Sequence, residues 1–344
     1  MPLTVGGAFD QFRRDVVDLD PENTKKARAS RDNLFTQIKI LAKNNSDFPE
    51  LKSDTPFINF GSFARRTKIK PLDDIDFLVI LNGSKRVAEK VSLFRTHKLQ
   101  FIRPSIALMG TRPSMALEQF LDDNDYINST ILLNRIKCHL SSVKNYEKAE
   151  IRRRGEVVTL KLNSYSWNYD IVPAIPMLNN YGGTAYFLIP DGKGNWKPTD
   201  PRIDEDNTTR VNKYHDGKFL PVVRLLKYWN SIAYNRPRLS SYYFETLAIK
   251  VFELSPKFAS LPHGVKLFFD RCPYYLNQPC PDLKCLEPDL DADLDWSQKE
   301  KVREAMASAS VYAGYALTYE LNSKHKDAIK HWQSIFGSKF PNYD

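Results

Sequence analysis

The sequence predicts an α+β fold in which a mixed β-sheet with flanking helices is followed by a helical region. Short apolar or alternating runs, which are typical of strands, fall between residues 57 and 189. From residue 218 onward, apolar side chains recur at helical spacing instead. We therefore expect two domains, residues 1–215 and residues 216–344. The 42% hydrophobic content of this 344-residue chain is enough to give them a sizeable core.

The first expected element is a helix over residues 21–43. Leu34, Ile38 and Leu41 lie on one of its faces, and Lys and Arg cover the other. A short apolar run over residues 57–60 ends at a glycine, as a strand running into a turn would. These two elements open the first domain.

The next strand, residues 74–81, is almost continuously apolar, which suits the middle of a sheet. The rest of the first domain is expected to hold helices over residues 116–123 and 129–149, strands over residues 156–162, 165–175 and 185–189, and loops elsewhere between 179 and 207. The second domain is expected to hold helices over residues 219–232, 242–254, 265–269, 298–321 and 324–336.

Composition narrows the class of partner. The formal net charge of +9 and the sequence pI of about 9.1 suit a partner rich in phosphate. They do not separate a triphosphate pocket from a nucleic-acid groove. The chain has no apolar run of about 18 residues and no signal peptide, so we expect a cytoplasmic protein with no membrane partner.

Two carboxylates, Asp74 and Asp76, are the first sign of chemistry. They are two residues apart on the expected strand, so their side chains point to the same face. Adjacent carboxylates repel each other, and a divalent cation removes that penalty. Mg²⁺ accepts carboxylate oxygens and keeps positions open for phosphate and water. Asp73 faces the opposite way on a regular strand, so we leave it out of the metal site.

A phosphate-binding turn is expected upstream at Gly61 and Ser62. Glycine lets the backbone approach a phosphate closely, and the serine hydroxyl adds a hydrogen-bond donor. A third carboxylate, Asp170, lies on a later expected strand. Three carboxylates suit two Mg²⁺ ions, or Mn²⁺ in their place, acting in phosphoryl transfer.

The basic residues between these motifs are ambiguous. Arg65, Arg66, Lys68 and Lys70 fit a path for phosphates and a solvated basic loop equally well. Further on, residues 152–154 are three arginines that a solvated turn explains better than a contact with nucleic acid or product.

A structural zinc site is not expected. His263, Cys272, Cys280 and Cys285 are too sparsely spaced to form the tight cysteine pairs of such a site. The acidic run over residues 282–295 reads as a solvated loop.

The Gly-Ser, the acidic pair and the third carboxylate, in this order, resemble the signature of the DNA polymerase β-like nucleotidyltransferase superfamily. Within it, the chain resembles the bacterial cGAS/DncV-like nucleotidyltransferases (CD-NTases, SMODS-type). The resemblance spans about residues 20–341. It implies a bi-lobed fold, with a mixed-sheet catalytic core and a carboxy-terminal helical lobe that completes the nucleotide pocket in the cleft between them.

Three later segments carry the narrower resemblance. RLLKYWN, residues 224–230, resembles the family's spine-helix motif and implies that Lys227 contacts the donor triphosphate. LSSYYFE, residues 239–245, implies Ser241 on the phosphates and Tyr242 stacking on the donor base. The third segment, HWQSIFGSKFP, resembles the family's closing pattern. From the residues alone, a helix cap at Ser241 and an ordinary core position at Tyr242 are favoured, and the resemblance favours the nucleotide site instead.

The resemblance implies a template-independent enzyme that joins nucleoside triphosphates, ATP among them, into a cyclic di- or trinucleotide messenger and releases pyrophosphate. It also implies bacterial anti-phage (CBASS-type) signalling, a regulatory protein and a separate effector that binds the product. Activation by RNA or DNA is an alternative that the positive charge permits. Two further alternatives are transfer onto RNA or protein, as in a tRNA-tailing or antitoxin-type enzyme, and nucleotide binding without catalysis. The sequence does not reveal the bases, the ring size or the linkage.

Overall fold

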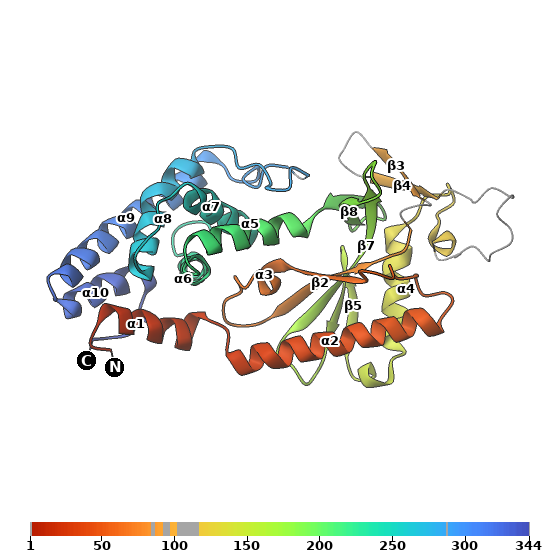
Figure 1. Ribbon diagram of the computed structural model, residues 1–344, viewed down its shortest axis with the longest axis horizontal. Helices are drawn as coiled ribbons and strands as arrows, with labels where there is room; N and C mark the ends of the chain where they lie inside the picture. The colour runs from red at the N-terminus through yellow and green to blue at the C-terminus, as the bar shows by residue number, and fades with distance from the viewer. Residues whose placement is uncertain (1, 84–86, 92–96, 102–116, 287, 344) are drawn as a thin grey trace. The chain divides into compact units, whose positions relative to one another are not determined.

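The computed structural model describes residues 2–83, 87–91, 97–101, 117–286 and 288–343 (Figure 1). The chain forms two compact units. The helical unit comprises Met1–Pro21, Arg65–Pro71 and Arg202–Asp344. The sheet unit comprises Glu22–Ala64 and Leu72–Pro201.

The sheet unit is built on one mixed β-sheet, as the sequence predicts. Its central order is β1-β2-β7-β8-β9-β4-β3, with β6 also paired to β7 and β5 paired to β6. β2 and β7 run parallel, and the other paired strands are antiparallel. The strands are β1 (Phe57–Phe60), β2 (Asp74–Ile80), β3 (Val87–Val91), β4 (His97–Phe101), β5 (Glu150–Arg154), β6 (Val157–Lys161), β7 (Asn168–Leu178), β8 (Thr184–Pro190) and β9 (Trp196–Thr199).

β2 is the central strand that its apolar sequence predicts. From Phe77 to its end every side chain is buried, and β1 and β7 flank it on its two edges. The predicted long helix is α2 (Pro21–Asn44), which packs on this part of the sheet. The ring of its Phe35 stacks on Phe57 of β1 at 4.1 Å and meets Phe77 edge-on at 4.8 Å.

The predicted helix over residues 129–149 is too long. α4 (Ser129–Ser141) begins at the Asn128 cap and ends eight residues early. The hydroxyls of Ser141 and Ser142 donate to the backbone carbonyls of Lys137 and His139, which competes with continued helix. The arginines of residues 152–154 lie on β5, paired with β6, and not in a turn.

Two other expectations for this region are wrong. Residues 117–123 contain a single 3₁₀ turn (Glu118–Phe120) where a helix was expected, and residue 116 lies outside the described part of the chain. α5 (Pro201–Tyr214) begins inside the stretch expected to be loops. Its sequence, PRIDEDNTTRVNKY, has few apolar residues, and the polar Asp204 and Thr208 lie on its buried face beside Val211.

The helical unit contains α1 (Val5–Phe12), a π-helical turn (Arg13–Val17), α5, α6 (Phe219–Ser231), α7 (Ser241–Glu253), α8 (Leu261–Leu276), α9 (Trp296–Leu321) and α10 (His325–Phe336). The last five confirm the predicted helices, although α8 is much longer than expected. α1 packs on α10 through Phe9, whose ring centroid is 4.9 Å from that of Trp332. It packs on α6 through Phe12 and Tyr228, at 5.0 Å. Both chain ends therefore lie in this unit (Figure 1).

No helix among the described residues has the length and apolar character needed to cross a membrane.

Candidate active site

In the sheet unit, the three predicted carboxylates lie on two neighbouring strands, β2 and β7. Asp76 of β2 is in register with Asp170 of β7, and Asp74 is in register with Asn168. All three acids are half-buried, whereas Asp73, just before β2, is exposed. The strand pairing therefore gathers Asp74, Asp76 and Asp170 at one end of the two central strands.

Gly61 lies directly against this acidic end. It follows β1, opens the short helix α3 (Gly61–Ala64) and has a left-handed φ of +74°. A Cβ atom at Gly61 would come within 1.9 Å of Oδ2 of Asp76. Only glycine fits both the backbone angle and the close approach. Ser62, the next residue, is half-buried.

Thr159 is a neighbour of the site that the sequence did not single out. It lies on β6 opposite Asp170, and its hydroxyl donates to Oδ1 of Asp170 at 2.8 Å.

Within the described residues, no group of three or more His, Cys, Asp or Glu side chains is arranged to hold a metal ion. The assignment of the three acids as metal ligands stays a prediction. Their all-oxygen donor set is the one that Mg²⁺ requires.

In the helical unit, Lys227 is buried in an ion cluster. Its Nζ lies 2.5 Å from Oε1 of Glu245, which belongs to the segment LSSYYFE and is buried too. Oε2 of Glu245 accepts hydrogen bonds from Nη2 of Arg65 at 3.0 Å and from the hydroxyl of Thr67 at 2.8 Å. A single carboxylate therefore holds two cations in place.

The pKa values in this cluster follow burial and pairing. Burial lowers the pKa of Lys227 below its ordinary value, and Glu245 offsets only part of that effect. Burial alone would raise the pKa of Glu245, but Arg65 and Lys227 outweigh it, and the pKa lies below its ordinary value. Glu245 is thus ionised at neutral pH.

The solvated-loop interpretation of residues 65–70 is wrong for Arg65. The Arg65 side chain is only 10% exposed and pairs with Glu245. Nζ of Lys70 donates to the backbone carbonyl of Arg14 at 2.7 Å. The sequence analysis identified the motif that contains Glu245. It did not predict that Glu245 pairs with Arg65, which lies 180 residues earlier in the chain.

The hydroxyl end of Tyr242 is held by a second buried network. Its oxygen lies 2.7 Å from carboxylate oxygens of both Asp204 and Asp282, and Nζ of Lys284 donates to it at 2.8 Å. Burial raises the pKa of Asp204, and burial together with the two carboxylates raises the pKa of Tyr242. The ring is therefore fixed at one end and stays a neutral phenol.

The same network corrects the expectation of a solvated acidic loop over residues 282–295. Asp282 and Asp291 are both buried. Asp282 pairs with Lys284 at 2.9 Å, and Asp291 pairs with Lys299 at 2.5 Å and accepts the backbone N–H of Cys280. These acids pin the loop between α8 and α9.

Ser241 does not cap α7. The cap is Ser240, whose hydroxyl accepts from the backbone N–H of Tyr243 at 3.3 Å. Ser241 is exposed at the first position of the helix, and no hydrogen bond of its hydroxyl is found within the described residues. Its role on phosphates stays a prediction, and the capping alternative is wrong.

The cysteines include two buried thiols, Cys272 and Cys280, and two exposed ones, Cys138 and Cys285.

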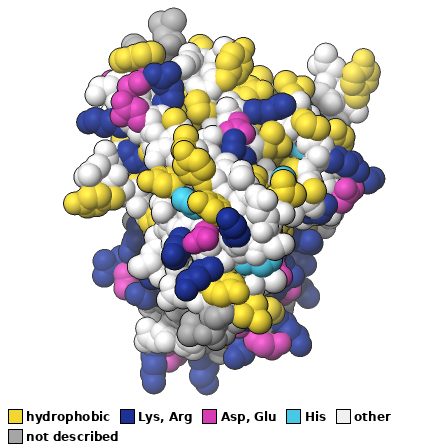
Figure 2. Space-filling view, turned by 90° about the vertical axis from the view of Figure 1, so that its left-hand side faces the viewer, with side chains coloured by type: hydrophobic (Ala, Val, Ile, Leu, Met, Phe, Trp, Pro, Cys, Tyr) yellow, Lys and Arg dark blue, Asp and Glu magenta, His cyan; other side chains and the backbone are white. Residues whose placement is uncertain are grey.

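On the face of the molecule drawn in Figure 2, Lys and Arg side chains are spread between apolar ones and acidic side chains are fewer. This distribution agrees with the formal net charge of +9.

Comparison with known proteins identifies relatives that match nearly the whole chain. No protein-family model matches it. A probable cyclic nucleotide synthase of Bacillus cereus strain VD146 is 35% identical over 345 residues, which cover all of both chains. The chain belongs to the cGAS/DncV-like nucleotidyltransferases. A cyclic AMP-AMP-AMP synthase of Escherichia coli strain MS 115-1 is 22% identical, with 96% of each chain covered. As a CD-NTase, the chain is a nucleotidyltransferase of the cyclic oligonucleotide synthase class.

Solved structures support the fold of this CD-NTase. E. coli MS115-1 CdnC with ATP matches with a TM-score of 0.69 at 19% identity, covering 98% of this chain and 99% of CdnC. Vibrio cholerae DncV, a cyclic AMP-GMP synthase solved with a linear intermediate, matches with a TM-score of 0.64 at 13% identity, covering 99% and 97%. The nucleotidyltransferase fold predicted from the sequence is confirmed.

Proposed function

We propose that this CD-NTase joins nucleoside triphosphates, ATP among them, into a cyclic di- or trinucleotide and releases pyrophosphate without a template. The observation that carries the proposal is the register of Asp76 with Asp170, with the backbone of Gly61 against Asp76. An E. coli relative is a cyclic AMP-AMP-AMP synthase, and the CdnC structure contains ATP, which supports ATP as a substrate.

Asp74, Asp76 and Asp170 would hold Mg²⁺, or Mn²⁺ in its place. Such ions supply charge neutralisation at the phosphates and lower the pKa of an attacking hydroxyl. Thr159 orients the Asp170 carboxylate through its 2.8 Å hydrogen bond. The close approach of Gly61 restricts the position of the Asp76 carboxylate. These two contacts restrain the carboxylates of Asp170 and Asp76, which favours a site formed before any nucleotide binds.

The remaining residues would bind the nucleotide. Gly61 offers a backbone that phosphate can approach, and Ser62 and Ser241 offer hydroxyl donors. Lys227 supplies positive charge for the triphosphate, and Glu245 keeps its ammonium in one orientation. Tyr242 presents an aromatic ring for the donor base, and its anchored hydroxyl limits rotation of that ring.

One neighbour supports a regulatory partner for this chain. CdnC of E. coli has been solved in a complex with a HORMA protein. We place this chain in the bacterial cytoplasm, in CBASS-type anti-phage signalling, with a regulatory protein and a separate effector that binds the cyclic product.

The test is to incubate the purified protein with four labelled ribonucleoside triphosphates and Mg²⁺ or Mn²⁺, then to add phosphatase and separate the products. We expect a small phosphatase-resistant product whose bases mass spectrometry identifies. Asp74→Asn combined with Asp76→Asn should abolish it. Asp73→Asn, at the exposed neighbouring carboxylate, is the matched control and should retain it.

Two results would contradict the proposal. Label that appears only on added RNA or protein would indicate a transferase acting on a macromolecule. Turnover that survives loss of both carboxylates would remove Asp74 and Asp76 from the reaction.

A further inference from the structure

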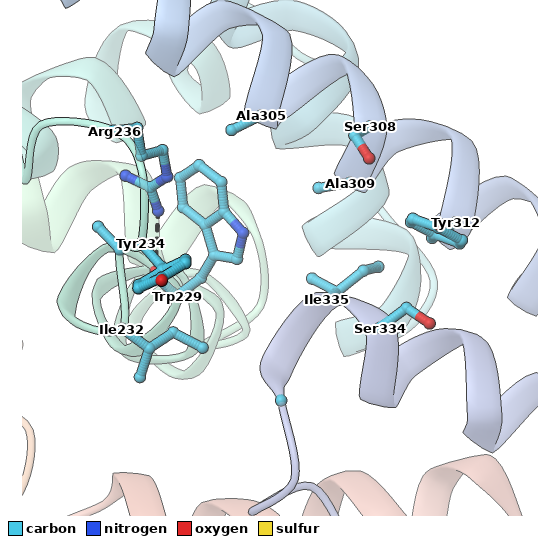
Figure 3. Close-up of a pocket in the computed structure, with 12 residues that line it drawn as sticks. Trp229, Ile232, Tyr234, Arg236, Ala305, Ser308, Ala309, Tyr312, Ser334 and Ile335 are labelled. Carbon is cyan, nitrogen blue, oxygen red and sulfur yellow. Dashed lines mark hydrogen bonds between the residues drawn. The ribbon is translucent and has the colours of Figure 1, made fainter.

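A cavity of about 290 Å³ lies inside the helical unit, lined by residues that the proposed chemistry does not use. Its walls come from the end of α6 and the turn after it, from α9, and from α10 (Figure 3). The volume falls at the small end of the range for ligand pockets, which is roughly 300–1,000 Å³. The lining contains Trp229, Ile232, Ala233, Tyr234, Arg236, Ala305, Ser308, Ala309, Tyr312, Ser334, Ile335 and Gly337.

Arg236 is the feature that suggests a ligand. Its guanidinium carbon lies 3.7 Å from the ring centroid of Trp229, a stacked cation–π contact visible in Figure 3. The side chain is half-buried, and burial lowers its pKa to about 10. A cation removed from water is costly unless an anion is near it.

Within the described residues, no carboxylate neutralises the charge of the Arg236 guanidinium. No acidic side chain lines the cavity, and Arg236 makes no ion pair in that part of the chain. Its contacts are neutral acceptors: the carbonyl of Trp229 at 3.0 Å, the carbonyl of Pro237 at 3.4 Å and Oδ1 of Asn230 at 3.5 Å. Arginine has five N–H donors, so these contacts leave at least two for another acceptor.

Two other partly buried arginines of the helical unit do have a carboxylate partner. Arg65 pairs with Glu245 at 3.0 Å, and Arg224 pairs with Asp18 at 2.7 Å. Arg236, by contrast, has no counter-charge among the described residues, and it faces a cavity.

The rest of the cavity fits an organic anion better than an inorganic one. Exposed rings of Tyr234 and Tyr312 and the small side chains of Ala305 and Ala309 leave space for a flat apolar body. Exposed Ser308 adds a hydroxyl at the rim. Such a mixture of aromatic surface with a few polar groups is typical of small-molecule sites.

The cavity is also held in shape without a ligand. Buried Asn230 donates through Nδ2 to the carbonyl of Leu239 at 2.8 Å, and its Oδ1 accepts the N–H of Leu239 at 3.2 Å. These two bonds close the turn that carries Tyr234 and Arg236. A ligand would therefore meet a largely preformed site.

We propose that this cavity binds a small organic anion, in which a carboxylate or a phosphate monoester pairs with Arg236 and a flat apolar body lies between α9 and the turn after α6. The site would be separate from the residues proposed for the nucleotide.

The experiment measures binding of phenyl phosphate and benzoate to the full chain by saturation-transfer NMR and calorimetry, with neutral benzamide as the matched probe. We expect both anions, but not benzamide, to bind, and the phenyl phosphate signal to persist with excess ATP. Arg236→Gln should weaken anion binding at least about tenfold, because a charge-assisted hydrogen bond is lost. The readout requires no turnover, so it is independent of the proposed reaction.

A second variant tests the proposal independently, in case Arg236→Gln does not fold. Ser308→Trp fills the rim from an exposed position and should abolish binding. Ala307→Trp, its exposed neighbour on α9 outside the lining, should bind normally. Equal binding of benzamide, unchanged binding in Ser308→Trp, or displacement of the anions by ATP would overturn the proposal.

Discussion

Gly61 shows how much a single position can determine in this enzyme. Its Cα sits where any side chain would collide with the carboxylate of Asp76, and its φ is left-handed. The sequence motif predicts a glycine for phosphate approach. The structure adds a second reason, because the same glycine makes room for a predicted metal ligand.

Gly61→Ala should lower turnover at least about 100-fold, since the new methyl group displaces Asp76 by about an ångström or more. Turnover of labelled triphosphate measures this loss. Gly155→Ala is the control: Gly155 also has a left-handed φ, but a Cβ atom there would have no neighbouring atom within 4 Å, so activity should be kept. Equal activity in the two variants would show that the contact with Asp76 is irrelevant.

Ser240 and Ser241 are neighbours with different expected roles. Ser241→Ala should leave stability unchanged but reduce kcat/KM for ATP about tenfold, through a lost hydrogen bond to phosphate. Ser240→Ala removes the α7 cap and should cost about 1 kcal/mol of unfolding free energy with near-normal activity per folded molecule. Denaturation curves and initial rates, measured on both, separate the two roles. Unaltered rates in Ser241→Ala would remove that serine from the site.

At the scale of elements, Glu245 connects α7 to α6 and to the segment Arg65–Pro71. Each connection is an ion pair or a hydrogen bond in a buried place. Removing one member leaves the others charged and without compensation, which costs more than the pair itself contributes. The cluster therefore matters to the fold as well as to the position of Lys227.

Glu245→Gln should reduce the free energy of unfolding by about 3–5 kcal/mol at neutral pH. The folded-state pKa of Glu245 is below its ordinary value of 4.5, so the carboxylate stabilises the fold above that pH. This contribution is lost as the pH falls through the lowered folded-state pKa. The gap between wild type and variant, measured by urea denaturation, should therefore narrow below about pH 4.5.

The control for this variant lies on the same helix. Glu253 of α7 pairs with Arg210 at the surface, and Glu253→Gln should cost less than about 1 kcal/mol. If the two variants lose the same free energy at neutral pH, burial of the Glu245 cluster contributes nothing.

At the scale of the whole molecule, the fold is similar to that of CdnC although few residues are identical. CdnC shares 19% of residues with this chain and still matches with a TM-score of 0.69. Binary patterning explains this, because many apolar residues can fill a strand such as β2 or a helix such as α6. The acidic residues on β2 and β7 cannot be exchanged in that way if they hold metal ions.

The sequence by itself determined the local features of this CD-NTase. Continuous apolar residues after Asp76 predict the buried strand β2, and helical spacing predicts α2, α6 and α7, because local periodicity reports which face is buried. It failed where polar residues occupy much of the buried face, as in α5, or where a helix ended without glycine or proline, as in α4.

Only the tertiary structure decided which distant residues meet. Nothing local in the sequence pairs Asp170 with Thr159, Arg65 with Glu245, or Tyr242 with Asp282. The free energy of such contacts depends on burial and on partners far along the chain, and neither is encoded in the spacing of neighbouring residues. For the same reason Arg236 reads as one more surface charge in the sequence, and among the described residues the fold places it without a counter-ion beside a cavity.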